Sequence, residues 1–167
     1  MFQLPADPTT YIGSAGTAGA NGDYRLGQLF LDPATGNFYK FVQNGGSSTS
    51  VYAKLATWLT GGARGVATMT DGSSTDGGLG TVASTAGVWQ AAIPTLCYGL
   101  LLVGSDYCDV YTDDGVVDGD YLVGDGGATH TFIADTAVAG EEHAVFGCAQ
   151  AADNDTTHLV VAQVWFQ

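Results

Sequence analysis

The 167-residue chain is short of basic residues, and none occurs after Arg64. It contains four Lys and Arg residues against 17 Asp and Glu, which gives a net charge of −13 at pH 7. Because only Asp7, Asp23 and Asp32 lie in the first 64 positions, residues 65–167 carry the other 14 carboxylates. Such a surface repels phosphate backbones and anionic lipids. We therefore expect neither nucleic acid nor a membrane as a partner.

The uneven charge has two interpretations. Net charge mostly sets solubility, so the acidic part of the chain serves to keep the protein dispersed. Alternatively, the molecule has two sides: a near-neutral side, built from residues 1–64, that docks on a partner, and an acidic side that faces solvent.

The sequence also lacks the motifs of common catalytic sites. GxSxG, GxxxxGK and HExxH are all absent. His130, His143 and His158 do not lie at metal-ligand spacing from another ligand or beside a nucleophile. We expect structural histidines, no catalytic residues, no cofactor and no enzymatic activity.

Cysteine is scarce and odd in number. Cys97, Cys108 and Cys148 match no metal spacing, and two of them lie in apolar contexts that favour buried, unreactive thiols. The start of the chain, MFQLPADPTT, has no basic region followed by a long apolar run. We expect synthesis in a reducing cytoplasm, without disulfides.

A cluster of acidic residues follows the most apolar part of the chain. It comprises Asp113, Asp114, Asp118, Asp120 and Asp125. Several carboxylates could hold calcium, but the EF-hand pattern is absent and Asp-Gly pairs are typical of turns. We expect turns and no metal site, with a calcium site as the alternative.

The elements that are present predict an all-β fold. The chain has 25 glycines, four prolines and no window typical of a long amphipathic helix. Ten to twelve short strand candidates at regular spacing predict a compact barrel or sandwich of short antiparallel strands. We expect the apolar run Leu96–Val103, between Pro94 and Gly104, to be the core strand. The last strand, Thr157–Phe166, is expected to cover an exposed sheet edge.

The N-terminal part predicts an arm and a hairpin. Residues 1–23 contain the small-residue segment Gly13–Gly22, which cannot fold alone. They form either a loose terminus or an extended arm on a neighbouring subunit, ahead of a domain over residues 24–167. Leu26–Leu31 and Phe38–Gln43 flank a turn with Pro33 and Gly36, which predicts a β-hairpin. Both faces of its second strand are partly apolar, so one face is available to a partner.

Several short motifs occur in a familiar order. G-D-Y-R-L-G at Gly22–Gly27 precedes the hairpin strand with Tyr39–Val42, and G-V-W-Q-A-A-I-P opens Gly87–Gly99. V-V-D-G-D-Y-L-V-G-D at Val116–Asp125 and A-V-F-G-C-A-Q-A-A-D at Ala144–Asp153 lead into the final hydrophobic strand. In this order the motifs resemble those of capsid decoration (cement) proteins of tailed bacteriophages, over residues 22–167.

The resemblance implies a non-enzymatic structural protein on the outer surface of the virion, made in the host cytoplasm. It implies binding to the assembled major-capsid lattice, stabilisation against internal genome pressure, and self-association, with a trimer favoured and a dimer possible. A charge-poor, aromatic-rich docking face fits such a contact. The candidate capsid-binding residues are Phe2, Leu4, Tyr11, Tyr24, Arg25, Phe38, Tyr39, Lys40 and Phe41.

The alternative is a phage fibre or tail domain, or another β module that binds host-surface carbohydrate. Trp58, Trp89 and Trp165 could stack on sugar rings, although a core role is the simpler expectation for each. Binding of glycans without affinity for capsids would favour this alternative.

Overall fold

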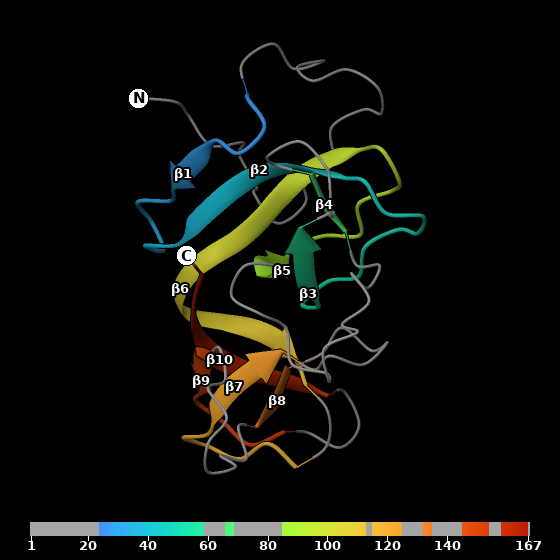
Figure 1. The fold of residues 1–167 in the computed structure, drawn as a ribbon. Helices are drawn as coiled ribbons and strands as arrows, with labels where there is room; N and C mark the ends of the chain where they lie inside the picture. The colour runs from blue at the N-terminus through green and yellow to red at the C-terminus, as the bar shows by residue number, and fades with distance from the viewer. Residues whose placement is uncertain are drawn as a thin grey trace.

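The computed structural model describes residues 24–58, 66–68, 85–112, 115–124, 132–134, 145–153 and 158–166. All regular structure in these ranges is β-strand, which confirms the all-β prediction (Figure 1). The described residues form no helix of the kind that crosses a membrane. The predicted N-terminal arm lies outside the described residues.

In the part of the chain that the structure describes, ten strands form one sheet. They are β1 (Leu29–Leu31), β2 (Phe38–Asn44), β3 (Leu55–Trp58), β4 (Val66–Thr68), β5 (Thr85–Trp89), β6 (Tyr98–Tyr111), β7 (Tyr121–Gly124), β8 (Phe132–Ala134), β9 (Val145–Ala149) and β10 (Leu159–Trp165). Their order is β1-β2-β4-β3-β5-β6-β10-β9-β7-β8, with an additional pairing of β2 with β6. All pairings are antiparallel except that of β2 with β4, which is parallel. The sheet as a whole is not closed.

The 14-residue strand β6 organises the fold. Its first half pairs with β2 and β5, and its second half pairs with β10. Leu100, Leu101 and Leu102 are almost completely buried, so the most apolar run of the sequence does form the central strand. The strand begins at Tyr98, however, and Leu96 is 53% exposed in the preceding turn. Gly104 does not end the strand, which continues to Tyr111.

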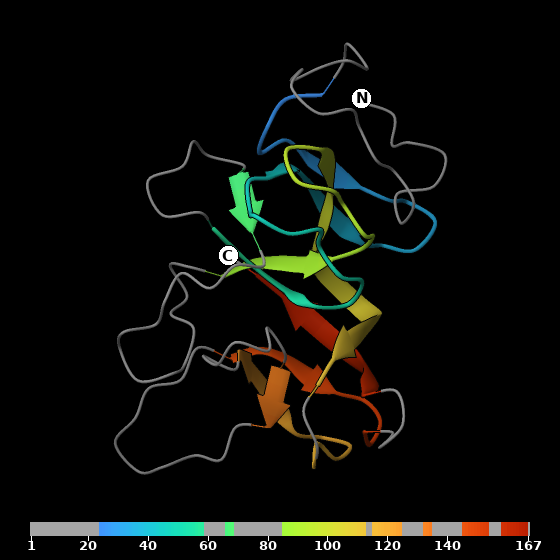
Figure 2. The ribbon, with the colours of Figure 1, turned by 90° about the vertical axis from the view of Figure 1, so that its right-hand side faces the viewer.

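The two halves of β6 connect two ends of the molecule (Figure 2). At one end, the pairings run from β2 through β4, β3, β5 and β6 and back to β2. Strands β2, β3, β5 and β6 supply Val42, Ala56, Trp89, Leu101 and Val103 to a cluster of buried residues. At the other end, β10, β9 and β7 continue the sheet, and a larger cluster extends along both parts.

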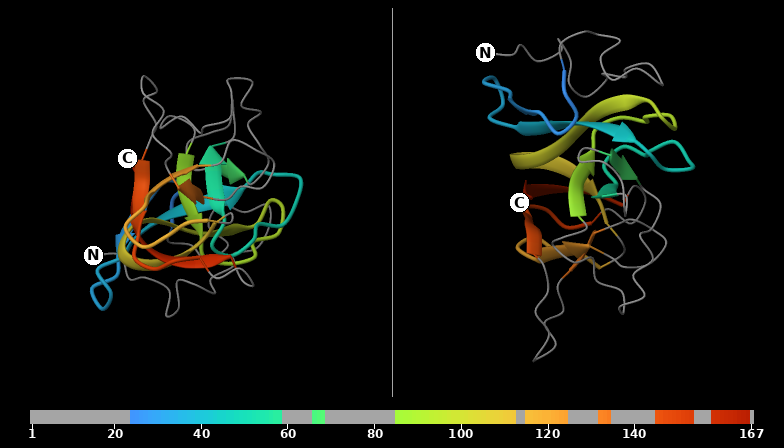
Figure 3. Two further views of the ribbon diagram at one scale, coloured as in Figure 1. Left: turned by 90° about the horizontal axis from the view of Figure 1, so that it is seen from below. Right: turned by 45° about the horizontal axis from the view of Figure 1, so that its top comes forward.

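We expected the final strand to cover an edge of the sheet, and this prediction is wrong. Strand β10 lies between β6 and β9 inside the sheet, and the edges are β1 and β8. The apolar residues Val160, Ala162 and Val164 are buried because both neighbours of β10 contribute to the core around them. The hairpin of β1 and β2 projects at the opposite end from β7, β8 and β9 (Figures 1 and 3).

Candidate docking surface

The turn between β1 and β2 is fixed by the side chain of Asp32. Its Oδ1 accepts a hydrogen bond from the Ala34 N–H at 2.9 Å, and its Oδ2 accepts one from the Thr35 hydroxyl at 2.7 Å. These bonds hold the pKa of Asp32 below its ordinary value. The Gly36 N–H donates to the Asp32 carbonyl, and its φ of 76° suits glycine. The predicted hairpin is therefore confirmed.

The register of the hairpin separates its inner face from its outer face. Leu29 pairs with Lys40, Phe30 with Tyr39, and Leu31 with Phe38. Phe30 and Tyr39 are buried, at 4% and 2% exposed. Paired residues share a face, and on the outer face Leu29, Leu31 and Phe38 are 60%, 52% and 48% exposed. The alternation in the second strand left both faces as candidates for a partner, and of the two this outer face is the exposed one.

An apolar row continues from the hairpin across the sheet. Leu31 pairs with Phe38, Phe38 with Gly104 of β6, and Gly104 with Trp165 of β10. The position of a Gly104 Cβ would lie 3.5 Å from Cδ2 of Phe38. Since glycine has no side chain, Phe38 lies over the strand, and Trp165, 42% exposed, flanks it on the other side.

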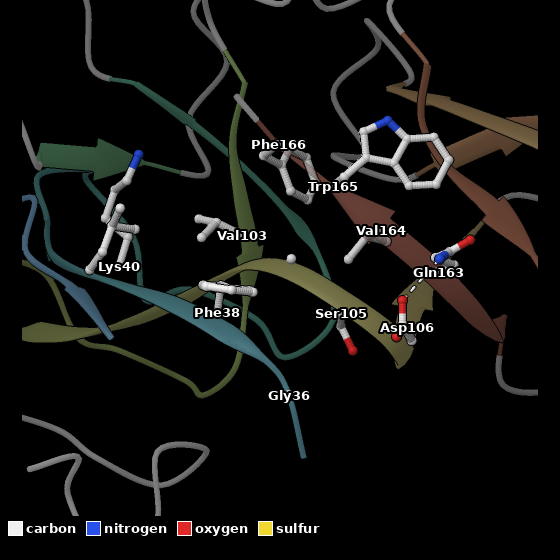
Figure 4. A pocket seen from close by; sticks show the side chains of 12 residues that line it. Gly36, Phe38, Lys40, Val103, Ser105, Asp106, Gln163, Val164, Trp165 and Phe166 are labelled. Atoms are coloured by element: carbon white, nitrogen blue, oxygen red, sulfur yellow. Dashed lines mark hydrogen bonds between the residues drawn. The ribbon is translucent and has the colours of Figure 1, made fainter. Parts of the chain in front are cut away.

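A pocket of about 490 Å³ opens beside this row (Figure 4). Its lining includes the apolar side chains of Phe38, Val103, Val164 and Phe166. On one side of it, the Gln163 side-chain amide donates to Asp106 Oδ1 at 2.9 Å. The pocket therefore combines apolar and hydrogen-bonded polar groups, as binding sites commonly do.

Lys40 lies at the margin of this pocket and is partly withdrawn from solvent. Its Nζ lies 5.0 Å from the centre of the Trp58 ring, a cation–π arrangement. Burial lowers the pKa of Lys40 because desolvation disfavours the charged ammonium. Lys40 is therefore held against the Trp58 ring at the margin of the pocket and does not extend freely into solvent.

The candidate capsid-binding residues differ in how far they are exposed to solvent. Arg25 is exposed, and Tyr24 is half-buried, with its ring 5.1 Å from that of Phe30. Tyr39 and Phe41 are buried in the larger core cluster, so neither is presented to a partner. Phe41 stacks on Tyr98 with ring centres 5.6 Å apart. Phe2, Leu4 and Tyr11 lie outside the described residues.

The three tryptophans also differ. Trp89 is fully buried and Trp58 packs against the same cluster, as expected for core residues. Trp165 lies at the surface beside the pocket.

In the acidic cluster, Asp120 accepts a hydrogen bond from the Val117 N–H at 2.9 Å, an arrangement typical of turns. Asp113, Asp114 and Asp125 lie outside the described residues.

The cysteines and histidines, which we expected to be structural, are dispersed. All three cysteines are partly exposed, although two of them were expected to be buried, and Cys97 and Cys108 pack at the margins of different core clusters. His158 lies 3.4 Å from Asp153, whose side chain is 2% exposed, while His130 and His143 lie outside the described residues. Within the described ranges, no three His, Cys, Asp or Glu side chains are placed to share a metal ion.

The sequence prediction missed three members of the apolar row. Leu29 and Leu31 were assigned only to a strand. Trp165 was expected in the core or at a covered edge, with sugar stacking as the alternative. The available signal was Gly104: a glycine inside a strand often marks the close approach of another group. Gly104 identifies Phe38 as the approaching group only when the pairing register of β2 and β6 is known.

No protein-family model matches this chain, and no curated protein sequence matches it.

Proposed function

We propose that this chain is a capsid decoration protein that binds the outside of an assembled capsid lattice and stabilises it. The observation that carries the proposal is the exposed apolar row of Leu29, Leu31, Phe38 and Trp165 on one side of the sheet. Contiguous apolar groups at the surface of a soluble domain are typical of interaction sites. The order of the sequence motifs, which resembles that of capsid decoration proteins, indicates a capsid lattice as the partner.

The surroundings of the row support a docking role. Its members are uncharged, in agreement with the depletion of charge at interface centres. Lys40 pairs with Leu29 of the row, and the strongly acidic part of the chain begins only after Arg64. An oligomer of this chain, such as the resemblance implies, contacts several sites of a lattice at once, so a modest contact at each site suffices for stable binding.

The test is co-sedimentation of the purified chain with shells that lack their decoration, followed by measurement of the shell's thermal rupture temperature. We expect binding and a higher rupture temperature. Leu31→Asp and Phe38→Asp should reduce binding at least about tenfold, a loss of roughly 1.4 kcal/mol each. Val117→Asp is the matched control, because Val117 is similarly exposed, at 53%, in a turn between β6 and β7.

Removal of residues 1–20 tests the predicted arm separately. We expect the shortened chain to fold and to lose capsid binding. Retained binding would contradict the arm hypothesis alone, whereas full binding by both Asp variants would contradict the apolar row as the docking surface.

A second candidate function rests on Trp165. Its exposed ring lies beside the hydrogen-bonded Gln163 and Asp106, and an aromatic ring with neighbouring amide and carboxylate groups suits a sugar. Binding on a glycan array that is lost in Trp165→Ala, with no affinity for shells, would favour a carbohydrate-binding module.

A further inference from the structure

The outer edge of β1 carries backbone groups that no described residue uses. Phe41 N–H donates to the Gln28 carbonyl, and Asp32 N–H donates to the Asn37 carbonyl, so Gln28 and Asp32 face β2. In an antiparallel pair, alternate residues turn their N–H and C=O groups to the partner strand. Leu29 and Leu31 consequently direct theirs away from β2. Among the described residues, only β2 pairs with β1.

We propose that two copies of this chain associate through this edge, β1 against β1, about a two-fold axis at Phe30. The sequence of the strand, Leu29-Phe30-Leu31, reads the same in both directions. Antiparallel pairing therefore places Leu29 of one copy opposite Leu31 of the other, twice. Each such pair exchanges two N–H···O=C bonds, so the edge forms four hydrogen bonds from groups that are otherwise exposed.

Neighbouring registers do not satisfy these groups. A shift that pairs Leu31 with itself places Leu29 opposite Pro33, which has no N–H to donate. A shift that pairs Leu29 with itself places Leu31 opposite Gly27, whose N–H already donates to the Phe41 carbonyl at 2.7 Å. The register centred on Phe30 is the one of the three in which all outward groups of Leu29 and Leu31 are used.

Side chains and charges agree with this register. Leu29 and Leu31 of the two copies share one face, so the apolar row of one hairpin continues into that of the other. The strand is uncharged, which lets two chains of net charge −13 approach each other there. In the antiparallel arrangement, the start of β1 in one copy, which follows Arg25, lies beside the end of β1 in the other copy, which precedes Asp32. Opposite charges therefore lie at matching ends of the paired strands.

Charge-exchange variants of the full chain test the proposal in sedimentation equilibrium. The wild-type chain should form reversible dimers. Leu29→Asp/Leu31→Asp and Leu29→Lys/Leu31→Lys should each dimerise at least about tenfold more weakly, because like charges face each other across the axis. An equimolar mixture of the two variants should regain a heterodimer. Val117→Lys, changed at an exposed site in a turn, is the control.

Amide exchange separates the proposed pairing from other kinds of association. The amides of Leu29 and Leu31 should exchange rapidly in dilute protein and become protected as its concentration rises, whereas Phe30 should be protected throughout. Leu31→Pro removes an outward N–H that the hairpin does not use, so it should fold and fail to dimerise.

Several results would overturn the proposal: a wild-type chain that is monomeric or trimeric at all concentrations, a variant mixture that stays monomeric, or Leu29 and Leu31 amides that are insensitive to concentration. Protection in dilute protein that is lost on removal of residues 1–20 would instead assign the edge to the chain's own N-terminal segment. Protection only on shells would assign it to a capsid strand.

Discussion

Gly87 lies in β5 against the backbone of β6. Its φ is 147°, and a Cβ at this position would lie 2.6 Å from the Leu102 carbonyl oxygen. We predict that Gly87→Ala destabilises the fold by about 2–3 kcal/mol, because both the backbone angle and the strand spacing must change. Chemical denaturation monitored by tryptophan fluorescence measures this loss.

Gly115→Ala is the matched control for the Gly87 prediction. Gly115 also has a positive φ, 93°, but nothing lies within 4 Å of its Cβ position. Only the cost of the backbone angle remains, about 1 kcal/mol. Equal losses for the two variants would show that the contact with β6 is unimportant.

A second prediction at this scale concerns the thiol of Cys108. Burial raises its pKa from 9.0 to about 12, and the nearby Asp109 adds to the effect. The thiolate population at pH 8 should therefore fall by about three orders of magnitude relative to an ordinary cysteine. We predict that Cys108, studied in a Cys97→Ser/Cys148→Ser chain, resists iodoacetamide until the protein is denatured. Alkylation at the same rate before and after denaturation would contradict the assigned burial.

The pKa of Cys108 also links stability to pH. Because the folded state holds the proton more tightly than the unfolded state, the stabilisation is complete below about pH 9 and is lost as pH rises toward 12. Tyr52 acts in the same sense, since burial and its 2.9 Å hydrogen bond to Asp109 raise its pKa to about 12. We predict that the unfolding midpoint falls steadily above pH 9. Tyr52→Phe should flatten part of this decline, and an unchanged pH profile in that variant would contradict the role of Tyr52.

At the scale of elements, the hairpin of β1 and β2 depends on one side chain in its turn. Asp32 accepts two of the side-chain hydrogen bonds of that turn, and the Thr35 hydroxyl that it holds accepts a third from the Asn37 N–H at 3.3 Å. We predict that Asp32→Ala lowers the thermal midpoint more than Asp32→Asn, since Asn keeps one acceptor for the Ala34 N–H. Because hydrogen bonding lowers the pKa of Asp32, its contribution is present above pH 3.8 and is lost as pH falls below that value. Equal midpoints for the two variants would show that the side-chain bonds are dispensable.

The elements also show how far the sequence could be interpreted. Strand periodicity and turn residues predicted this hairpin, because Asp32, Pro33 and Gly36 act locally. They could not decide between the two apolar faces of β2. Tyr39 and Phe41 were assigned to docking with Phe38 and Lys40, and the choice depends on β6, about 60 residues further along the chain. The continuity of β6 through Gly104 was missed for the same reason: a glycine ends a strand or permits a close approach according to what lies above it.

At the scale of the whole molecule, the charge asymmetry of the sequence is only partly an asymmetry in space. Arg25 precedes β1 and Lys40 lies in β2, at the end of the molecule with the hairpin (Figure 1). Lys54 instead lies with its Nζ 4.8 Å from the ring centre of Tyr111, the last residue of β6. The end formed by β7, β8 and β9 belongs to the part of the chain without a basic residue. Most of its carboxylates therefore have no cation nearby in sequence to offset their mutual repulsion.

Self-repulsion of this kind gives a last prediction. Salt screens like charges over about 10 Å at 0.1 M ionic strength, so raising NaCl from about 10 to 500 mM should raise the unfolding midpoint. We expect an increase of about 3 °C, equivalent to roughly 1 kcal/mol for a chain of this size. Asp118→Asn removes one exposed carboxylate and should reduce the increase without abolishing it. A midpoint that falls with salt would mean that local attractions, such as those of Lys40 and Lys54 with aromatic rings, outweigh the repulsion.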